Sequence, residues 1–452
     1  MPEALHQLGV KAVIHGLREG RFTSEDLMRD CLERIEKLES KIEAWAWLDP
    51  FAALASAHAA DHARREGKLG ALQGVPIGIK DIIDVRGVPT RMGSSLFEDY
   101  IPSASARVVR RLDEAGAVVL GKTVTTELAY LGPGKTRNPW NTGHTPGGSS
   151  SGSAAAVAAR FVPATIGTQT NGSVIRPAAF CGVVGYKPSS GLLPRAGILK
   201  FSHTLDQVGV FGRSVEDTAI VCSAMLDRSA EVPDSNPEIT QVPRDLVPAP
   251  LYQPPRVAAV RTSMWHLVEK DQQENFLQTI AQFRKVGAVV ESAVLPDAFS
   301  RAHEVHRVIM HYEGARSFAG LQTQNRDRLG AEMNRLIDDG NLISETAYHA
   351  ALEHRTRLQS ELAEFARRYD ILITLPARGE APATLEHTGD PGFCTIWTLC
   401  GAPTITIPSG LGTQGMPLGM QLVGAHMQDA RLLEVAQWCA GQIGFLSNPA
   451  EQ

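Results

Sequence analysis

Apolar residues follow a helical period near the start of the chain and a strand pattern soon afterwards. Between Thr23 and Glu43 they recur at intervals of three and four residues, and the Thr23-Ser24 pair that precedes them can cap a helix. Residues 50–66 predict a second helix. From Val75 to Val85 the sequence is apolar and β-branched between two glycines, which is typical of a buried strand and its exit loop. Residues 108–121 predict a helix over 108–115 followed by another buried strand.

The same alternation resumes after a proline-rich stretch. Seven prolines lie between Pro233 and Pro255 with few periodic apolar residues, which predicts a surface excursion. Beyond it, strands are expected at 256–260, 371–374 and 404–407, and helices at 271–286, 301–321, 345–368 and 430–443.

Alternating helices and strands favour a single large α/β domain, in which a twisted, mostly parallel or mixed β-sheet is covered by helices on both faces. The sequence contains no internal repeat and no low-complexity segment. We divide the domain 1–452 into an N-terminal helical region at about 1–70, a core at about 71–225, the proline-rich excursion at about 230–256, and a C-terminal half at about 257–452 whose strands rejoin the sheet.

Composition and charge narrow the class of protein. The chain is 43% hydrophobic and 21% charged, as expected of a globular protein, and its net charge of −5 with scattered basic residues gives no reason to expect a nucleic-acid partner. Six cysteines lie far apart, so disulfides are not expected and a reducing cytoplasm is the expected location. No run of about 18 apolar residues suits a membrane span.

Two glycine- and serine-rich stretches, 147–153 and 167–177, hold the candidate chemistry. Ser173 follows Asn171 and Gly172, two residue types that tolerate unusual backbone angles and let consecutive N–H groups turn toward one point. Acyl transfer needs such donors beside a hydroxyl. Alone, an Asn-Gly-Ser triplet is most often an ordinary turn.

Taken together, these stretches resemble the serine- and glycine-rich signature of the amidase signature family, including the alanine-rich helix that follows Ser153. Residues 74–83 resemble the segment that supplies that family's lysine. Residues 213–217, 370–374 and 419–424 also resemble family landmarks, so the resemblance extends over nearly the whole chain.

The resemblance implies a catalytic role for three side chains: Ser173 as nucleophile, Ser149 as the intermediate serine and Lys80 as base. It implies an oxyanion hole formed by the backbone N–H groups of Thr170, Asn171, Gly172 and Ser173, with Ser150 in support. Independently, a lysine acts as a base only when it is neutral, and Lys80 stands in an apolar run where desolvation favours the neutral amine.

This chain departs from the family pattern at three positions. Gln169 and Asn171 stand where the family usually has Asp and Gly, and Arg176 follows the nucleophile by three residues instead of two. We expect the hydrogen bonds around the hole to be rewired rather than lost, with Gln169 and Arg176 in supporting positions. The role of Arg176 stays open.

Other motifs are weaker. Residues 148–152 satisfy the nucleophile-elbow pattern with Ser150 at its centre, but a loop-like segment precedes them where an elbow needs a strand. A metal site could be suggested by His303, His306 and His311 with Glu304 and Glu313, yet the HExxH spacing is absent. We expect solvated or pocket-lining histidines and no metal. The glycine-rich loop lacks the GK[ST] ending of a phosphate-binding loop.

The resemblance therefore predicts an amidohydrolase that cleaves an amide, anilide, carbamate or ester bond of a small molecule without a cofactor. Two alternatives remain: the amidase-like subunit of a tRNA-dependent amidotransferase, and a non-catalytic binding protein on the same fold. The substrate pocket is expected to include Tyr130, Leu131, Trp140, Phe393 and Trp397. The sequence leaves the substrate and a homodimeric state open.

Overall fold

The structure is a computed structural model that describes residues 4–227, 243, 245–445 and 449. Most of the predicted proline-rich excursion, residues 230–242 and 244, lies outside the described residues.

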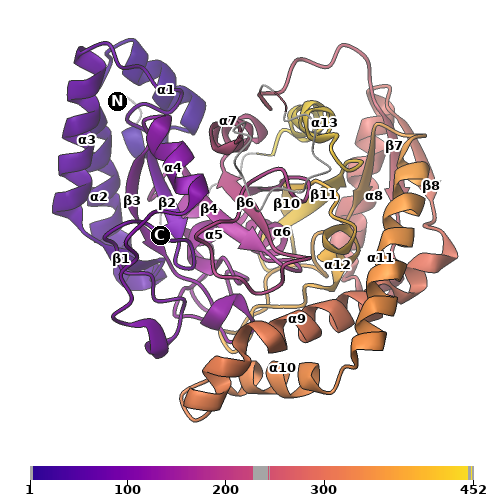
Figure 1. The fold of residues 1–452 in the computed structure, drawn as a ribbon. Coiled ribbons are helices and arrows are strands. Elements are labelled where there is room, and N and C mark those ends of the chain that lie inside the picture. Colours follow the sequence, from indigo (N-terminus) through magenta and orange to yellow (C-terminus); the bar gives the residue numbers. More distant parts are fainter. Residues whose placement is uncertain (1–3, 228–242, 244, 446–448, 450–452) are drawn as a thin grey trace.

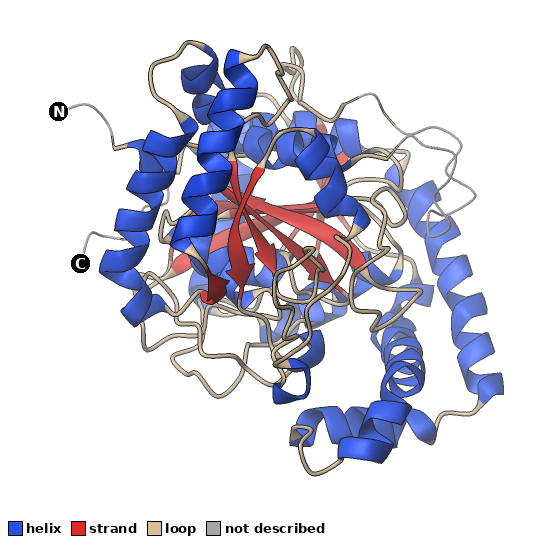
Figure 2. Ribbon diagram, turned by 60° about the vertical axis from the view of Figure 1, so that its left-hand side comes forward, coloured by secondary structure: helices blue, strands red, loops and turns tan. Residues whose placement is uncertain are grey.

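The described residues form one 11-stranded mixed sheet in the order β1-β3-β2-β4-β6-β5-β10-β11-β9-β7-β8. Figure 2 shows its strands fanned into a twisted sheet between layers of helices. The strands are β1 (Trp45–Leu48), β2 (Pro76–Lys80), β3 (Val118–Thr123), β4 (Ala164–Gln169), β5 (Val184–Lys187), β6 (Gln207–Gly212), β7 (Arg256–Val260), β8 (Val289–Ala293), β9 (Ile371–Thr374), β10 (Thr404–Leu411) and β11 (Pro417–Val423).

Helices cover both faces of this sheet, as Figure 1 shows. One face carries α1, α4, α7, α8 and α13, and the other carries α3, α5, α6, α9, α11 and α12. The helices are α1 (Val10–Arg18), α2 (Ser24–Ile42), α3 (Pro50–Arg65), α4 (Arg107–Glu114), α5 (Ser151–Ala158), α6 (Ile175–Cys181), α7 (Val215–Met225), α8 (Lys270–Lys285), α9 (Ala302–Asn325), α10 (Ala331–Asn341), α11 (Glu345–Ala366), α12 (Gly392–Leu399) and α13 (Asp429–Ile443). The predicted single α/β domain is confirmed.

The longer helices follow directly from local sequence. Thr23 caps α2 through a reciprocal capping box with Asp26, so α2 begins where the Thr23-Ser24 pair predicted. Asp49 caps α3, and Pro50 occupies its first turn, where a missing N–H costs nothing. Each helix then buries one apolar stripe, which supplies most of its stability.

The two halves of the chain meet inside the sheet. β10 pairs antiparallel with β5, with Ile405 opposite Tyr186, and β11 then pairs with β9. The C-terminal strands therefore extend the sheet of the N-terminal half, and the signature loops lie near its centre.

Among the described residues, no helix combines the length and the apolar composition that a membrane span requires. The six cysteines are all buried and carry free thiols.

Candidate active site

Lys80 is the last residue of β2, a fully buried strand that runs parallel to both β3 and β4. Its side chain is fully buried. The Nζ atom lies 2.7 Å from Ser149 Oγ and 2.9 Å from Thr168 Oγ1, which belongs to the neighbouring strand β4. Among the described residues, the amine thus contacts two hydroxyls and no carboxylate.

Burial lowers the pKa of Lys80 to about 7, because a charged ammonium loses its hydration in this position. The negative charge of Asp206 opposes the shift but does not cancel it. Near neutral pH a large share of the molecules therefore holds a neutral amine, which can accept a proton from Ser149.

Ser149 and Ser150 lie where a loop enters α5. The Gly148–Ser149 peptide bond is cis. Ser150 Oγ lies 3.2 Å from the carbonyl oxygen of Thr168 and 3.3 Å from its backbone nitrogen, so it fastens the loop to β4. Gly147 is required before this pair: its φ is +82°, and a Cβ there would come within 2.7 Å of Pro177 Cα.

Ser173 lies in the turn between β4 and α6, with 9% of its surface exposed. Within the described part of the chain, its Oγ and the backbone N–H groups of Asn171, Gly172 and Ser173 make no hydrogen bond. The next two N–H groups, those of Val174 and Ile175, donate to Gln169 Oε1 at 2.7 and 3.0 Å. The turn therefore presents a hydroxyl beside unused donors, the arrangement that an oxyanion hole needs.

Gln169 and Asn171, two residues that differ from the family pattern, connect this turn to α12. Gln169 Nε2 donates to Thr398 Oγ1 at 2.9 Å, and that hydroxyl donates to the carbonyl oxygen of Asn171 at 2.6 Å. Thr395 Oγ1 donates to Asn171 Oδ1 at 2.8 Å. Two threonines one helical turn apart thus hold the side chain and the backbone of Asn171.

Arg176 is buried and connects its own helix α6 to two other backbone segments. It donates to the carbonyl oxygens of Gly148 and Thr388, each at 2.7 Å, and to that of Gly389. Burial lowers its pKa to about 10, so the guanidinium stays charged at neutral pH. Because Gly148 precedes Ser149, Arg176 holds the peptide group that joins these two residues.

The histidines of α9 contact the signature loops. His306 is buried, and its Nε2 lies 2.9 Å from the carbonyl oxygen of Thr170. His303 Nε2 lies 2.9 Å from the carbonyl oxygen of Gly392, at the start of α12. Burial lowers the pKa of His306 to about 4, so the neutral ring donates this bond. His306 is therefore not solvated, because it is buried against the backbone that leads into the turn of Ser173.

No three His, Cys, Asp or Glu side chains converge into a metal-binding group in the part of the chain that the structure describes.

Comparison with known proteins identifies the family of this chain. A family model described as Amidase matches residues 26–433. The chain belongs to the amidase signature family.

Curated relatives include two proteins named as subunits of glutamyl-tRNA(Gln) amidotransferase. That of Alkaliphilus metalliredigens is 30% identical over 99% of both chains, and that of Dehalococcoides mccartyi is 33% identical over 93% of this chain and 94% of its own. The solved structure of the native peptide amidase from Stenotrophomonas maltophilia matches with a TM-score of 0.84 and 29% identity, covering 98% of each chain. As a member of the amidase signature family, this chain is an enzyme that acts on carbon–nitrogen bonds.

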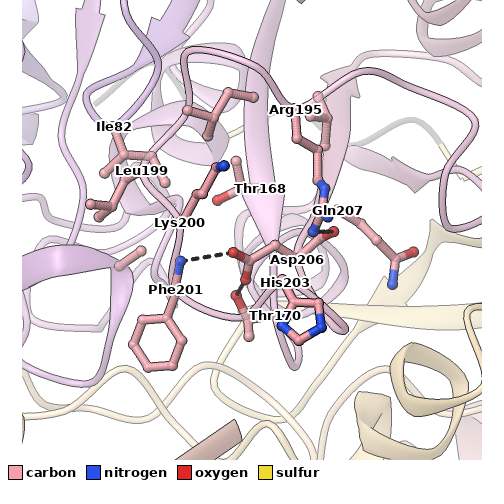
Figure 3. A pocket seen from close by; sticks show the side chains of 13 residues that line it. Ile82, Thr168, Thr170, Arg195, Leu199, Lys200, Phe201, His203, Asp206 and Gln207 are labelled. Atoms are coloured by element: carbon pink, nitrogen blue, oxygen red, sulfur yellow. Dashed lines mark hydrogen bonds between the residues drawn. The ribbon is translucent and has the colours of Figure 1, made fainter. Parts of the chain in front are cut away.

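A cavity of about 70 Å³ adjoins the amidase signature residues. It reaches Thr168, the partner of Lys80, and Thr170, whose Oγ1 donates to Asp206 at 2.6 Å (Figure 3). Its other lining residues are Ile82, Ala129, Arg195, Ile198, Leu199, Lys200, Phe201, His203, Asp206, Gln207 and Val208.

The five expected pocket residues of this amidase do not line that cavity. Tyr130 comes closest, because it follows the lining residue Ala129 and stacks on Phe201 at 5.7 Å between ring centres. Leu131 is partly exposed, and Trp140 borders a separate cavity beside α2. Phe393 and Trp397 are buried in the core between α12 and its neighbours.

Sequence reasoning did not identify Thr168, Asp206, Thr395 and Thr398. Thr395 and Thr398 carried a usable signal, since two hydroxyls at a helical spacing of three in an otherwise apolar segment call for buried partners. Thr168 carried none, because its contact with Lys80 forms across strands that lie 88 residues apart in sequence.

Proposed function

We propose that the protein is a free-standing amidohydrolase that cleaves the amide, anilide, carbamate or ester bond of a small molecule through an acyl-enzyme on Ser173. The observation that supports it best is the 2.7 Å contact between Lys80 Nζ and Ser149 Oγ, at a lysine whose pKa is lowered to about 7 by burial. An ordinary surface lysine is almost fully protonated at neutral pH and could not act as a base.

In the proposed reaction, Ser173 Oγ bonds to the carbonyl carbon while its proton passes to Ser149, whose own proton passes to Lys80. The N–H groups of residues 170–173 stabilise the negative oxygen of the tetrahedral intermediate. Collapse breaks the carbon–nitrogen bond, and a proton returns through Ser149 to the leaving nitrogen. Water then repeats the sequence on the acyl-enzyme and releases the acid. These steps call for neither a metal ion nor an organic cofactor.

Supporting residues hold the reacting groups in place. Ser150 fastens the Ser149 loop to β4. Gln169 accepts hydrogen bonds from the backbone N–H groups of Val174 and Ile175, the two residues after Ser173. Arg176 holds the peptide group before Ser149. Such positioning matters because small displacements of reacting groups cost large factors in rate.

The test is covalent labelling with a fluorophosphonate, together with hydrolysis of activated anilides. Ser173→Ala should abolish both labelling and turnover, by several orders of magnitude, while circular dichroism stays unchanged. Ser150→Ala removes the neighbouring supporting hydroxyl and should still be labelled, although more slowly, because Ser173 remains. Labelling that persists in Ser173→Ala would assign the nucleophile elsewhere, with Ser150 examined first.

A second candidate is a subunit of a glutamyl-tRNA(Gln) amidotransferase, which the names of the curated relatives favour. It would imply partner subunits and a tRNA-bound substrate. The replacements at Gln169, Asn171 and Arg176 favour the free-standing enzyme, since they depart from the pattern we associate with such subunits. Full amidase activity of the purified, uncomplexed chain would support the first candidate. Activity that requires added partner subunits would support the second.

We further propose that the enzyme works in the cytoplasm, on a small molecule and without a membrane or nucleic-acid partner. The free buried thiols and the net charge of −5 support this proposal. A homodimer is compatible with it, and light scattering of the purified protein would measure the oligomeric state.

A further inference from the structure

Two cations, Arg195 and Lys200, line the cavity beside the signature residues, together with the carboxylate of Asp206. Arg195 donates to the backbone carbonyl of Asp206 at 3.0 Å, and Lys200 is a solvent-exposed residue of the cavity lining. Across the described residues, neither side chain forms an ion pair. Figure 3 shows both reaching into the same space as Thr168 and Asp206.

The carboxylates near this cavity are already engaged. Asp206 accepts hydrogen bonds from Thr170 Oγ1 at 2.6 Å and from the N–H groups of Phe201 and Ser202, each at 2.9 Å. Glu313 lies behind the cavity wall, where it accepts from Tyr348 at 2.7 Å and pairs with His203 at 3.1 Å. Arg195 interacts electrostatically with Asp206 without forming an ion pair, whereas no acidic side chain among the described residues pairs with Lys200.

The rest of the cavity is apolar and small. Its walls include Ile82, Ile198, Leu199, Phe201 and Val208, and its volume is about 70 Å³. Apolar walls lower the local dielectric constant and strengthen the attraction between charges. A space of this size accepts only a short group of a few heavy atoms.

From these observations we infer that the substrate carries a carboxylate, which this cavity receives and Lys200 pairs with. Lys200 is then a specificity-determining residue. A singly charged carboxylate matches the single charge of Lys200, whereas a doubly charged phosphate would leave a negative excess beside Asp206. This inference rests on the proposed function, since it describes the substrate of the same Ser173 site.

The carboxylate can belong to the acyl part or to the amine part of the amide, and two pairs of substrates distinguish these sources. The acyl pair is the 4-nitroanilide of succinic acid against that of succinamide, its neutral isostere. The amine pair is N-acetyl-3-aminobenzoate against N-acetyl-3-aminobenzamide. For each pair, kcat/KM is measured for wild type, Lys200→Met, Lys200→Glu and the control Lys270→Met, which removes an exposed lysine on α8.

In one pair, wild type should favour the charged amide by about 10-fold or more, as for a hydrogen bond between charged groups. Lys200→Met should remove that preference while the neutral amide keeps its rate, Lys200→Glu should reverse it, and Lys270→Met should leave it intact. Added salt should weaken the preference, because ions screen the attraction.

Equal kcat/KM for charged and neutral amides in both pairs would overturn the inference, as would a uniform loss on both members of a pair in Lys200→Met. Either result leaves the proposed function standing, since Ser173-dependent turnover persists. Absence of both turnover and fluorophosphonate labelling in wild type would instead refute the proposed function itself.

Discussion

Replacing Lys80 by Met separates the proposed base from a structural lysine. Methionine keeps much of the length and apolar packing of the side chain but cannot titrate. The proposed function predicts that Lys80→Met loses most of its turnover, because nothing then accepts the proton of Ser149. The structure adds a second expectation, that the inactive variant is more stable than wild type.

The size of that gain follows from the pKa of Lys80. Burial lowers this pKa from 10.5 to about 7, and a difference of one in pKa corresponds to about 1.4 kcal/mol between the two protonation states. Below pH 7 the lysine is charged in both the folded and the unfolded chain, so the folded state bears the full penalty, on the order of 5 kcal/mol. Above pH 10.5 it is neutral in both, and the penalty vanishes.

The assay is the unfolding midpoint of wild type and Lys80→Met between pH 6 and pH 10, beside a pH–rate profile on one activated anilide. The variant should unfold several degrees higher at pH 6, and the difference should shrink as the pH rises from about 7 to 10.5. Other buried lysines such as Lys187, whose pKa is also lowered to about 7, affect both proteins alike and cancel in the difference. His144→Ala is the control for activity and should cost far less.

The stability measurement is needed because the acid limb of the pH–rate profile does not by itself distinguish a lysine base from a histidine base. A Lys80 limb near pH 7 lies close to that of a histidine base at about 6.5. Near-normal turnover with an unchanged acid limb in Lys80→Met would refute the assignment of Lys80 as the base. A stability difference that does not change with pH would refute the lowered pKa, whatever the activity.

Two further predictions concern groups around the site. Metal chelators should leave the rate unchanged, since no proposed step uses an ion; activity lost to EDTA and restored by zinc would revive a site at His303 and His306. His306→Leu should lower kcat by about 10-fold or more with little change in KM, because the carbonyl of Thr170 loses its buried donor. His306→Gln offers a replacement N–H and should recover part of that loss, whereas equal rates in both variants would assign His306 a packing role only.

Much of the fold could be predicted because its longer elements carry local signals. The capping box at Thr23 and the apolar stripe behind it defined α2 to within one residue at each end. The strands β1, β4, β5, β6, β8 and β11 were not predicted. Of these, β4, β5 and β6 are buried on both faces and contain glycine and polar residues, so neither alternation nor an apolar run marks them.

The candidate site was only partly predictable for a related reason. Lys80 stands in a local apolar run, and the two glycine- and serine-rich stretches are contiguous motifs, so sequence was enough to select them. The contacts of Lys80 with Thr168 and of His306 with Thr170 join residues 88 and 136 positions apart. Such contacts depend on strand order and helix packing, which periodicity does not encode.

The order of strands in the sheet also determines how the chain must fold during synthesis. β10 and β11, which are synthesised after β5 and β9, lie between β5 on one side and β9 on the other. Until residues 404–423 emerge, the N-terminal and C-terminal parts of the sheet have no strand to join them, and each exposes an unpaired edge. Unpaired edges can recruit other chains, so we expect a nascent chain that still lacks residues 404–423 to be prone to aggregation.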